Sequence, residues 1–239
     1  MYIIWKREWR SFFHTPVGYA FVGAFLSLSG IVFYVSHLQN LSGELLTFLP
    51  QMTLFVMLLT PLLTMRLLCE ERQKRTDQLL FTSPISLTQI VLGKYFAAAA
   101  VLLTAIFLTQ VYVLVIFLFG KVYLGEWFVG YLGFVLQSLS FLALDLLVTC
   151  GAKNQVSAAI AAFAANFVLW MVDQLARVVP VPFLQRALGF ISLYDRYEPF
   201  ILGQLSYASI VFFLSFMAVC LVATIHVLDA RRFSRGGAA

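Results

Sequence analysis

Charged side chains are scarce in this chain. Asp, Glu, Lys and Arg make up 11% of its 239 residues, whereas hydrophobic residues make up 62% and phenylalanine alone occurs 24 times. In an average soluble domain, roughly a quarter of the residues are charged. The composition therefore excludes a soluble globular protein and indicates an integral membrane protein.

Motifs for nucleotide binding, metal binding and hydrolysis are also missing. No phosphate-binding loop of the form G-x-x-x-x-G-K-[ST] occurs, because Gly93-Lys94 is followed by Tyr95. There is no C-x-x-C, H-E-x-x-H or G-x-S-x-G pattern, and the three histidines are far apart. We interpret the cysteines Cys69, Cys150 and Cys220 as small buried hydrophobic residues. We therefore expect no catalytic residue, metal site or cofactor site in this chain.

Six apolar runs are each close to the roughly 20 residues that a helix needs to cross a bilayer. They cover residues 17–36, 48–68, 90–119, 127–150, 156–173 and 205–228. We predict an all-α polytopic membrane protein with six transmembrane helices and one domain over residues 1–239.

Basic residues are distributed unequally between the two sides of this arrangement. Of the 16 lysines and arginines, only Lys121, Arg177, Arg186 and Arg196 fall on the side opposite the termini. The positive-inside rule then places both termini in the cytoplasm. The net charge of +5 is explained by this topology and by anionic membrane lipid, so nucleic acid is not expected as a partner.

The first 16 residues predict a helix that lies in the membrane interface. Aromatic residues recur at the spacing that places them along one stripe of a helix, and the basic residues lie outside this stripe. The stripe comprises Tyr2, Trp5, Trp9, Phe12 and Phe13, and the basic residues are Lys6 and Arg10. The alternative is an ordinary positive-inside flank with aromatic anchors.

The densest run of charge, residues 70–89, connects the second and third predicted spans. Thr76 can cap a short helix, and Pro84 ends it by forcing Ser83 out of helical geometry. Ser86 and Gln89 have capping-box spacing and predict the start of the third span. The short helix carries the apolar residues Leu79, Leu80 and Phe81 inside a charged rim of Glu70, Glu71, Arg72, Lys74, Arg75 and Asp77. Such a patch is typical of a docking surface, and the alternative is a loop whose apolar residues dip into lipid.

The stretch KRTDQLLFTSPISLTQIVLGKYFA resembles the corresponding loop of ABC-2 type transporter permeases. The matching positions are Thr76, Asp77, Leu79, Leu80, Ser83, Pro84, Ile90, Gly93 and Lys94. Arg75 stands where Gly is usual in the family. Residues 152–160 and 191–216 also resemble family segments, the latter those of the gliding-motility-type subgroup.

The resemblance implies a permease with a type V exporter-like fold in a bacterial inner membrane. It implies an elbow helix over residues 1–16, a cytoplasmic coupling loop over 70–89, and re-entrant helices in an extracytoplasmic loop over 174–204. The elbow residues would be Trp5, Lys6, Trp9, Arg10, Phe12 and Phe13. The coupling residues would be Glu70, Glu71, Arg72, Lys74, Arg75, Thr76, Asp77, Leu79, Leu80, Phe81, Thr82, Ser83 and Pro84.

The partners implied by the resemblance are two copies of an ABC ATPase subunit, which would hold ATP and Mg, and a second permease, identical or similar. The chain would export its substrate by alternating access. A membrane anchor or adaptor without translocation of its own, and an intramembrane enzyme, stay open as alternatives. Asp145 is the one ionisable residue well inside a predicted span, and it is either a packing acid or a group that lines a pathway.

Overall fold

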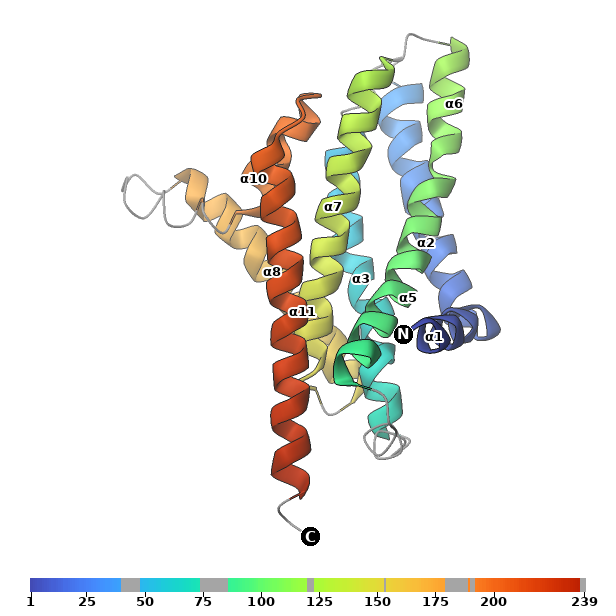
Figure 1. The fold of residues 1–239 in the computed structure, drawn as a ribbon. Helices are drawn as coiled ribbons and strands as arrows, with labels where there is room; N and C mark the ends of the chain where they lie inside the picture. Colours follow the sequence, from blue (N-terminus) through green and yellow to red (C-terminus); the bar gives the residue numbers. More distant parts are fainter. Residues whose placement is uncertain are drawn as a thin grey trace.

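The computed structural model describes residues 1–39, 48–73, 86–119, 123–152, 154–178, 189 and 192–236, and every element in these ranges is a helix (Figure 1). In chain order the elements are α1 (Tyr2–His14), α2 (Pro16–Phe33), the π-helix η1 (Tyr34–Leu38), α3 (Phe48–Gln73), α5 (Leu87–Leu108), α6 (Gln110–Phe119), α7 (Leu124–Thr149), α8 (Gln155–Val178), α10 (Leu193–Ile201) and α11 (Tyr207–Gly236).

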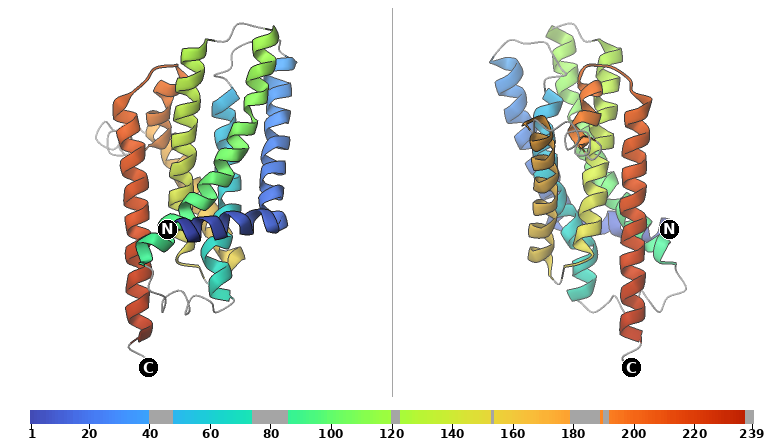
Figure 2. Two further views of the ribbon diagram at one scale, coloured as in Figure 1. Left: turned by 45° about the vertical axis from the view of Figure 1, so that its right-hand side comes forward. Right: turned by 90° about the vertical axis from the view of Figure 1, so that its left-hand side faces the viewer.

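Within the described residues, six segments are long and apolar enough to cross a membrane, which confirms the predicted all-α fold with six transmembrane helices. They are Pro16–Leu38, Phe48–Cys69, Leu87–Leu118, Leu124–Thr149, Gln155–Val172 and Tyr207–Ala230. The spans run side by side, and α1 lies across them nearer the end of the bundle at which α11 ends (Figure 2).

The third span is bent, where the sequence predicts one continuous helix. At Thr109 the backbone N–H donates to the carbonyl of Ile106, three residues back, at 3.2 Å. The Thr109 hydroxyl donates to the same carbonyl at 2.6 Å. A threonine hydroxyl that bonds back to its own helix competes with the regular ladder and often bends the helix. The span therefore divides into α5 and α6.

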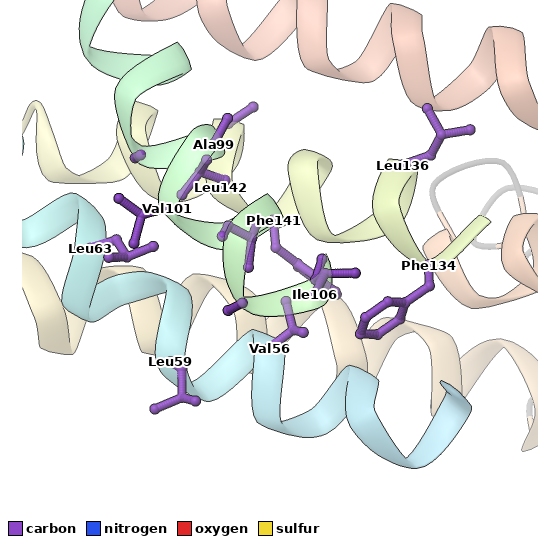
Figure 3. Close-up of a cluster of buried hydrophobic side chains, with 14 of the residues drawn as sticks. Val56, Leu59, Leu63, Ala99, Val101, Ile106, Phe134, Leu136, Phe141 and Leu142 are labelled. Atoms are coloured by element: carbon purple, nitrogen blue, oxygen red, sulfur yellow. The ribbon is translucent and has the colours of Figure 1, made fainter. Parts of the chain in front are cut away.

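The hydrophobic core lies between α3, α5 and α7. Figure 3 shows side chains from these three helices, among them Val56 of α3, Val101 of α5 and Phe141 of α7, and all three are buried. α7 also packs against α8, α10 and α11, so it occupies the centre of the bundle. Close packing of this kind fixes how the helices lie relative to each other because cores tolerate few voids.

The short helix α10 packs against α7 and lies between the two ends of the bundle (Figure 2). The Ser192 hydroxyl caps its start by accepting from the N–H of Asp195 at 3.1 Å. Gly203, with φ of 70°, lies in the turn that follows the helix, a conformation that favours glycine. A re-entrant helix pair over 174–204 stays a prediction, because residues 179–188 and 190–191 lie outside the described part of the chain.

Phe200 of α10 lies directly on Gly133 of α7. A Cβ atom added at Gly133 would be 2.4 Å from the Cβ of Phe200, and Phe200 is fully buried. This distance is far shorter than a van der Waals contact. Glycine at position 133 is therefore what allows α10 to approach α7.

We predict that Gly133→Ala destabilises the protein by about 1–3 kcal/mol, because overpacking a core forces its neighbours to shift. Gly23→Ala on α2 is the matched control, since a Cβ there meets nothing within 4 Å. Thermal unfolding of the two purified variants in lipid checks the prediction. Equal unfolding midpoints would show that α10 does not sit on α7 as described.

Candidate site for coupling: the loop base

The candidate functional site lies where α1 meets the end of α3 and the start of α5. These two helix ends flank residues 74–85, the stretch that contains most of the predicted coupling residues. We call this region the loop base and define it by Glu8 of α1, Arg66 and Leu67 of α3, and Gly93 and Lys94 of α5.

A sharp turn between α1 and α2 directs α1 across the bundle. Thr15 is extended, with φ of −110° and ψ of 156°, and Pro16 begins α2. A residue before proline is disfavoured in the helical region, so the chain turns here. A Cβ at Gly18 would lie 2.6 Å from the carbonyl oxygen of Phe12, so the absence of a side chain at Gly18 allows this close approach.

The apolar contact between α1 and α5 depends on Gly93. A Cβ added at Gly93 would lie 2.9 Å from Cγ2 of Ile4, and Ile4 is buried. Nearby, the Trp5 indole N–H donates to the carbonyl of Phe96 at 3.3 Å. These contacts hold α1 against the first turns of α5.

Lys94 is the central polar residue of the loop base. Its side chain is 1% exposed, and Nζ donates to the carbonyl oxygen of Leu67 at 2.5 Å. The same nitrogen lies 3.4 Å from Oε1 of Glu8, whose side chain is 14% exposed. A buried ammonium is tolerated only when hydrogen bonds and an opposite charge compensate for lost water. One side chain thus links α1, α3 and α5.

A second cation joins α3 to the turn after α1. Arg66 donates to the hydroxyl of Thr15, and its Nη2 donates to the hydroxyl of Ser11 at 3.4 Å. Thr15 also donates to the carbonyl of Ser11 at 2.8 Å, which stabilises the turn. The end of α3 is therefore tied to α1 on the side of Arg66 as well as through Lys94.

The predicted coupling residues fall partly beyond the described structure. Glu70, Glu71 and Arg72 belong to α3, which continues to Gln73, past the predicted end of the second span at residue 68. The remaining predicted coupling residues lie outside the described residues: Lys74, Arg75, Thr76, Asp77, Leu79, Leu80, Phe81, Thr82, Ser83 and Pro84. Their docking role stays a prediction. The family resemblance implies a coupling helix over residues 72–83, whereas Arg72 belongs to α3 in the structure.

The helix predicted for the first 16 residues is present as α1. The rings of Trp5 and Trp9 are stacked with centroids 6.2 Å apart, and Trp9 and Phe13 are 4.9 Å apart. Lys6 and Arg10 are exposed, and Phe12 is buried.

The buried face of α1 was not identified from the sequence. Ile4, Glu8 and Phe12 follow each other at intervals of four residues and therefore share one face of the helix. Ile4 and Phe12 are buried against the bundle and Glu8 pairs with Lys94. This spacing was the available signal, but the sequence analysis assigned Phe12 to the aromatic stripe and did not consider Ile4 and Glu8 with it.

Asp145 lies away from the loop base, completely buried in α7. Its carboxyl group faces the side chains of Thr60 on α3 and Asn166 on α8. Among the described residues, no group of three or more His, Cys, Asp and Glu side chains could hold a metal ion.

An apolar groove runs between the bent third span and α7. Its lining includes Leu103, Phe107, Gln110, Trp127 and Tyr131. The Trp127 indole N–H donates to Gln110 Oε1 at 3.1 Å, so the indole donor is satisfied within the groove.

Comparison with known proteins agrees with this architecture. A family model described as "ABC-2 family transporter protein" matches residues 14–194, well over half of the chain. The match includes the ends of α3 and α5 that form the loop base. A comparison with curated proteins gives no match. The chain is therefore a permease-type membrane component and belongs to the ABC-2 transporter family.

Proposed function

We propose that this chain is the permease subunit of a bacterial ABC exporter, and that ATP hydrolysis in a separate subunit drives its alternating access. Membrane components of this family pair with an ATPase subunit in general. Two copies of the ATPase, which carry ATP and Mg, would act on two permeases, identical or similar. Both termini and residues 74–85 would face the cytoplasm of the inner membrane.

The observation that carries the proposal is the link that Lys94 makes between the helices on either side of residues 74–85. Its Nζ donates to Leu67 of α3 and lies beside Glu8 of α1. Removing one partner of a buried ion pair costs about 3–5 kcal/mol. A force applied to the loop would therefore move the ends of α3 and α5 together with α1, as one unit.

The docking surface in this proposal is the short stretch around Leu79, Leu80 and Phe81. Its apolar side chains would enter a groove of the ATPase, and the charges around them would set the orientation. When the ATPase subunits close on ATP, the loop would be displaced. The loop base would convert that displacement into movement of α3 and α5.

The first test changes the docking surface. We expect Leu80→Asp combined with Phe81→Asp to abolish both binding of the ATPase and its stimulation, because charges replace the apolar contact. The variant should still insert into the membrane, since neither position lies in a span. ATP hydrolysis by the partner ATPase, with wild-type or variant permease in proteoliposomes, is the measurement.

The control for this test is Gln73→Asp combined with Gln78→Asp, which adds the same two charges at polar positions. We expect it to retain most of the stimulation. Wild-type binding and stimulation by the Leu80→Asp, Phe81→Asp variant would refute the docking role. Binding without stimulation by the wild-type chain would favour the anchor or adaptor function instead.

The second test separates docking from force transmission. Lys94→Met leaves residues 74–85 unchanged but removes the ammonium that joins α1, α3 and α5. We expect the ATPase to bind with an affinity within a few-fold of wild type, while its stimulation falls by roughly tenfold or more, as loss of 1.4 kcal/mol or more of coupling would give.

The matched control is Lys6→Met, which removes an exposed lysine from α1. It should behave as wild type in both assays. Full stimulation by Lys94→Met would show that the loop base does not transmit force. An equal loss of stimulation in both variants would assign the effect to the charge of α1 rather than to the buried link.

A further inference from the structure

Pro61 creates an unusual backbone position inside α3. Proline has no N–H, so the carbonyl of Met57, four residues earlier, has no partner in the regular helical ladder. The side-chain amide of Asn166 on α8 supplies one, because Nδ2 donates to this carbonyl at 3.1 Å. Asn166 is completely buried, so α8 and α3 are joined here inside the bundle.

Asp145 of α7 lies beside this junction. Its carboxyl group faces Asn166 and also Thr60, the residue before Pro61. All three side chains are completely buried. Three helices therefore direct oxygen-bearing side chains toward one place.

The oxygens of this cluster make no hydrogen bond of normal geometry. Asp145 lies close enough to Thr60 and Asn166 to interact with both, but its two carboxyl oxygens, the hydroxyl of Thr60 and Oδ1 of Asn166 have no partner in hydrogen-bonding position. No Lys, Arg or His side chain in the described part of the chain forms a salt bridge with Asp145. An uncompensated carboxylate inside a membrane protein is costly, so a positive charge has to come from elsewhere.

We propose that Asp145, Thr60 and Asn166 form a buried site for one monovalent cation. A single carboxylate is neutralised by one positive charge, whereas a divalent ion would leave an excess. The partners are all oxygens, which are the ligands that hard cations take.

The cation is either a proton on the carboxyl group or an alkali-metal ion among the oxygens. Either cation would supply the missing positive charge and would hold α3, α7 and α8 together. The bound cation is part of the packed structure and is independent of the loop base. The outcome of a test of this site is therefore independent of the proposed function.

The test is infrared spectroscopy of the full chain in lipid at neutral pH, in a medium with choline as the only added monovalent cation. A bound proton gives the carbonyl band of a protonated carboxylic acid. This band should vanish in Asp145→Asn and persist in Asp195→Asn, which removes an exposed carboxyl group of α10. Thr60→Val should shift the band, because the carboxyl group loses a neighbouring donor.

A bound metal ion gives the other supporting result. Replacing choline by Na⁺ or K⁺ at constant ionic strength then removes the band, because the metal ion displaces the proton, and it raises the thermal midpoint of wild type and of Asp195→Asn. The midpoint of Asp145→Asn should not respond, and Thr60→Val should respond less than wild type.

The proposal is overturned if wild type shows neither the band nor a response to Na⁺ or K⁺, because Asp145 would then be an ionised group with no bound cation. It is equally overturned if the band or the response is unchanged in Asp145→Asn. The asparagine variant is isosteric and neutral, and Thr60→Val gives a second comparison that keeps Asp145 in place.

Discussion

The buried ammonium group of Lys94 is the interaction on which the arrangement of the loop base depends. Its compensation comes from the carbonyl of Leu67 and the carboxylate of Glu8, which belong to two different helices. Because a lysine cannot stay buried without such partners, the start of α5 is fixed relative to both the end of α3 and α1. The position of α1 across the bundle follows from the same requirement, aided by the close contact of Ile4 with Gly93.

This arrangement gives a physical reason for the Gly-Lys pair that follows the predicted coupling loop. Gly93 lets α1 approach α5, and Lys94 fixes it there, so the pair acts in helix assembly. α1 is thus connected to both helices that flank residues 74–85 in the sequence. In the proposed permease, the loop contacts the ATPase, and the loop base determines which helices move. The buried cluster around Asp145 serves another part of the bundle, where it joins α3, α7 and α8.

Features that depend on local sequence were predictable. The six spans follow from apolar runs, the start of α5 follows from the Ser86 cap, where the hydroxyl accepts from the N–H of Gln89 at 3.3 Å, and α1 follows from its helical spacing. Features that depend on distant partners were not. Glu8 and Lys94 are 86 residues apart in the sequence, and neither residue type indicates its partner. The contact of Phe200 with Gly133 was hidden for the same reason.

The central claim is that α1 and the start of α5 move as one unit during the ATP cycle, and a disulfide between Ile4→Cys and Gly93→Cys tests it most directly. A Cβ at Gly93 would lie 3.1 Å from that of Ile4, slightly less than the roughly 3.5–4.5 Å of a disulfide, and Ile4→Cys removes Cγ2, which is the nearest atom. With Cys69, Cys150 and Cys220 replaced, the account predicts that the disulfide forms and that stimulation of the partner ATPase is the same before and after reduction. Failure to form the disulfide, or loss of stimulation that reduction restores, would contradict it.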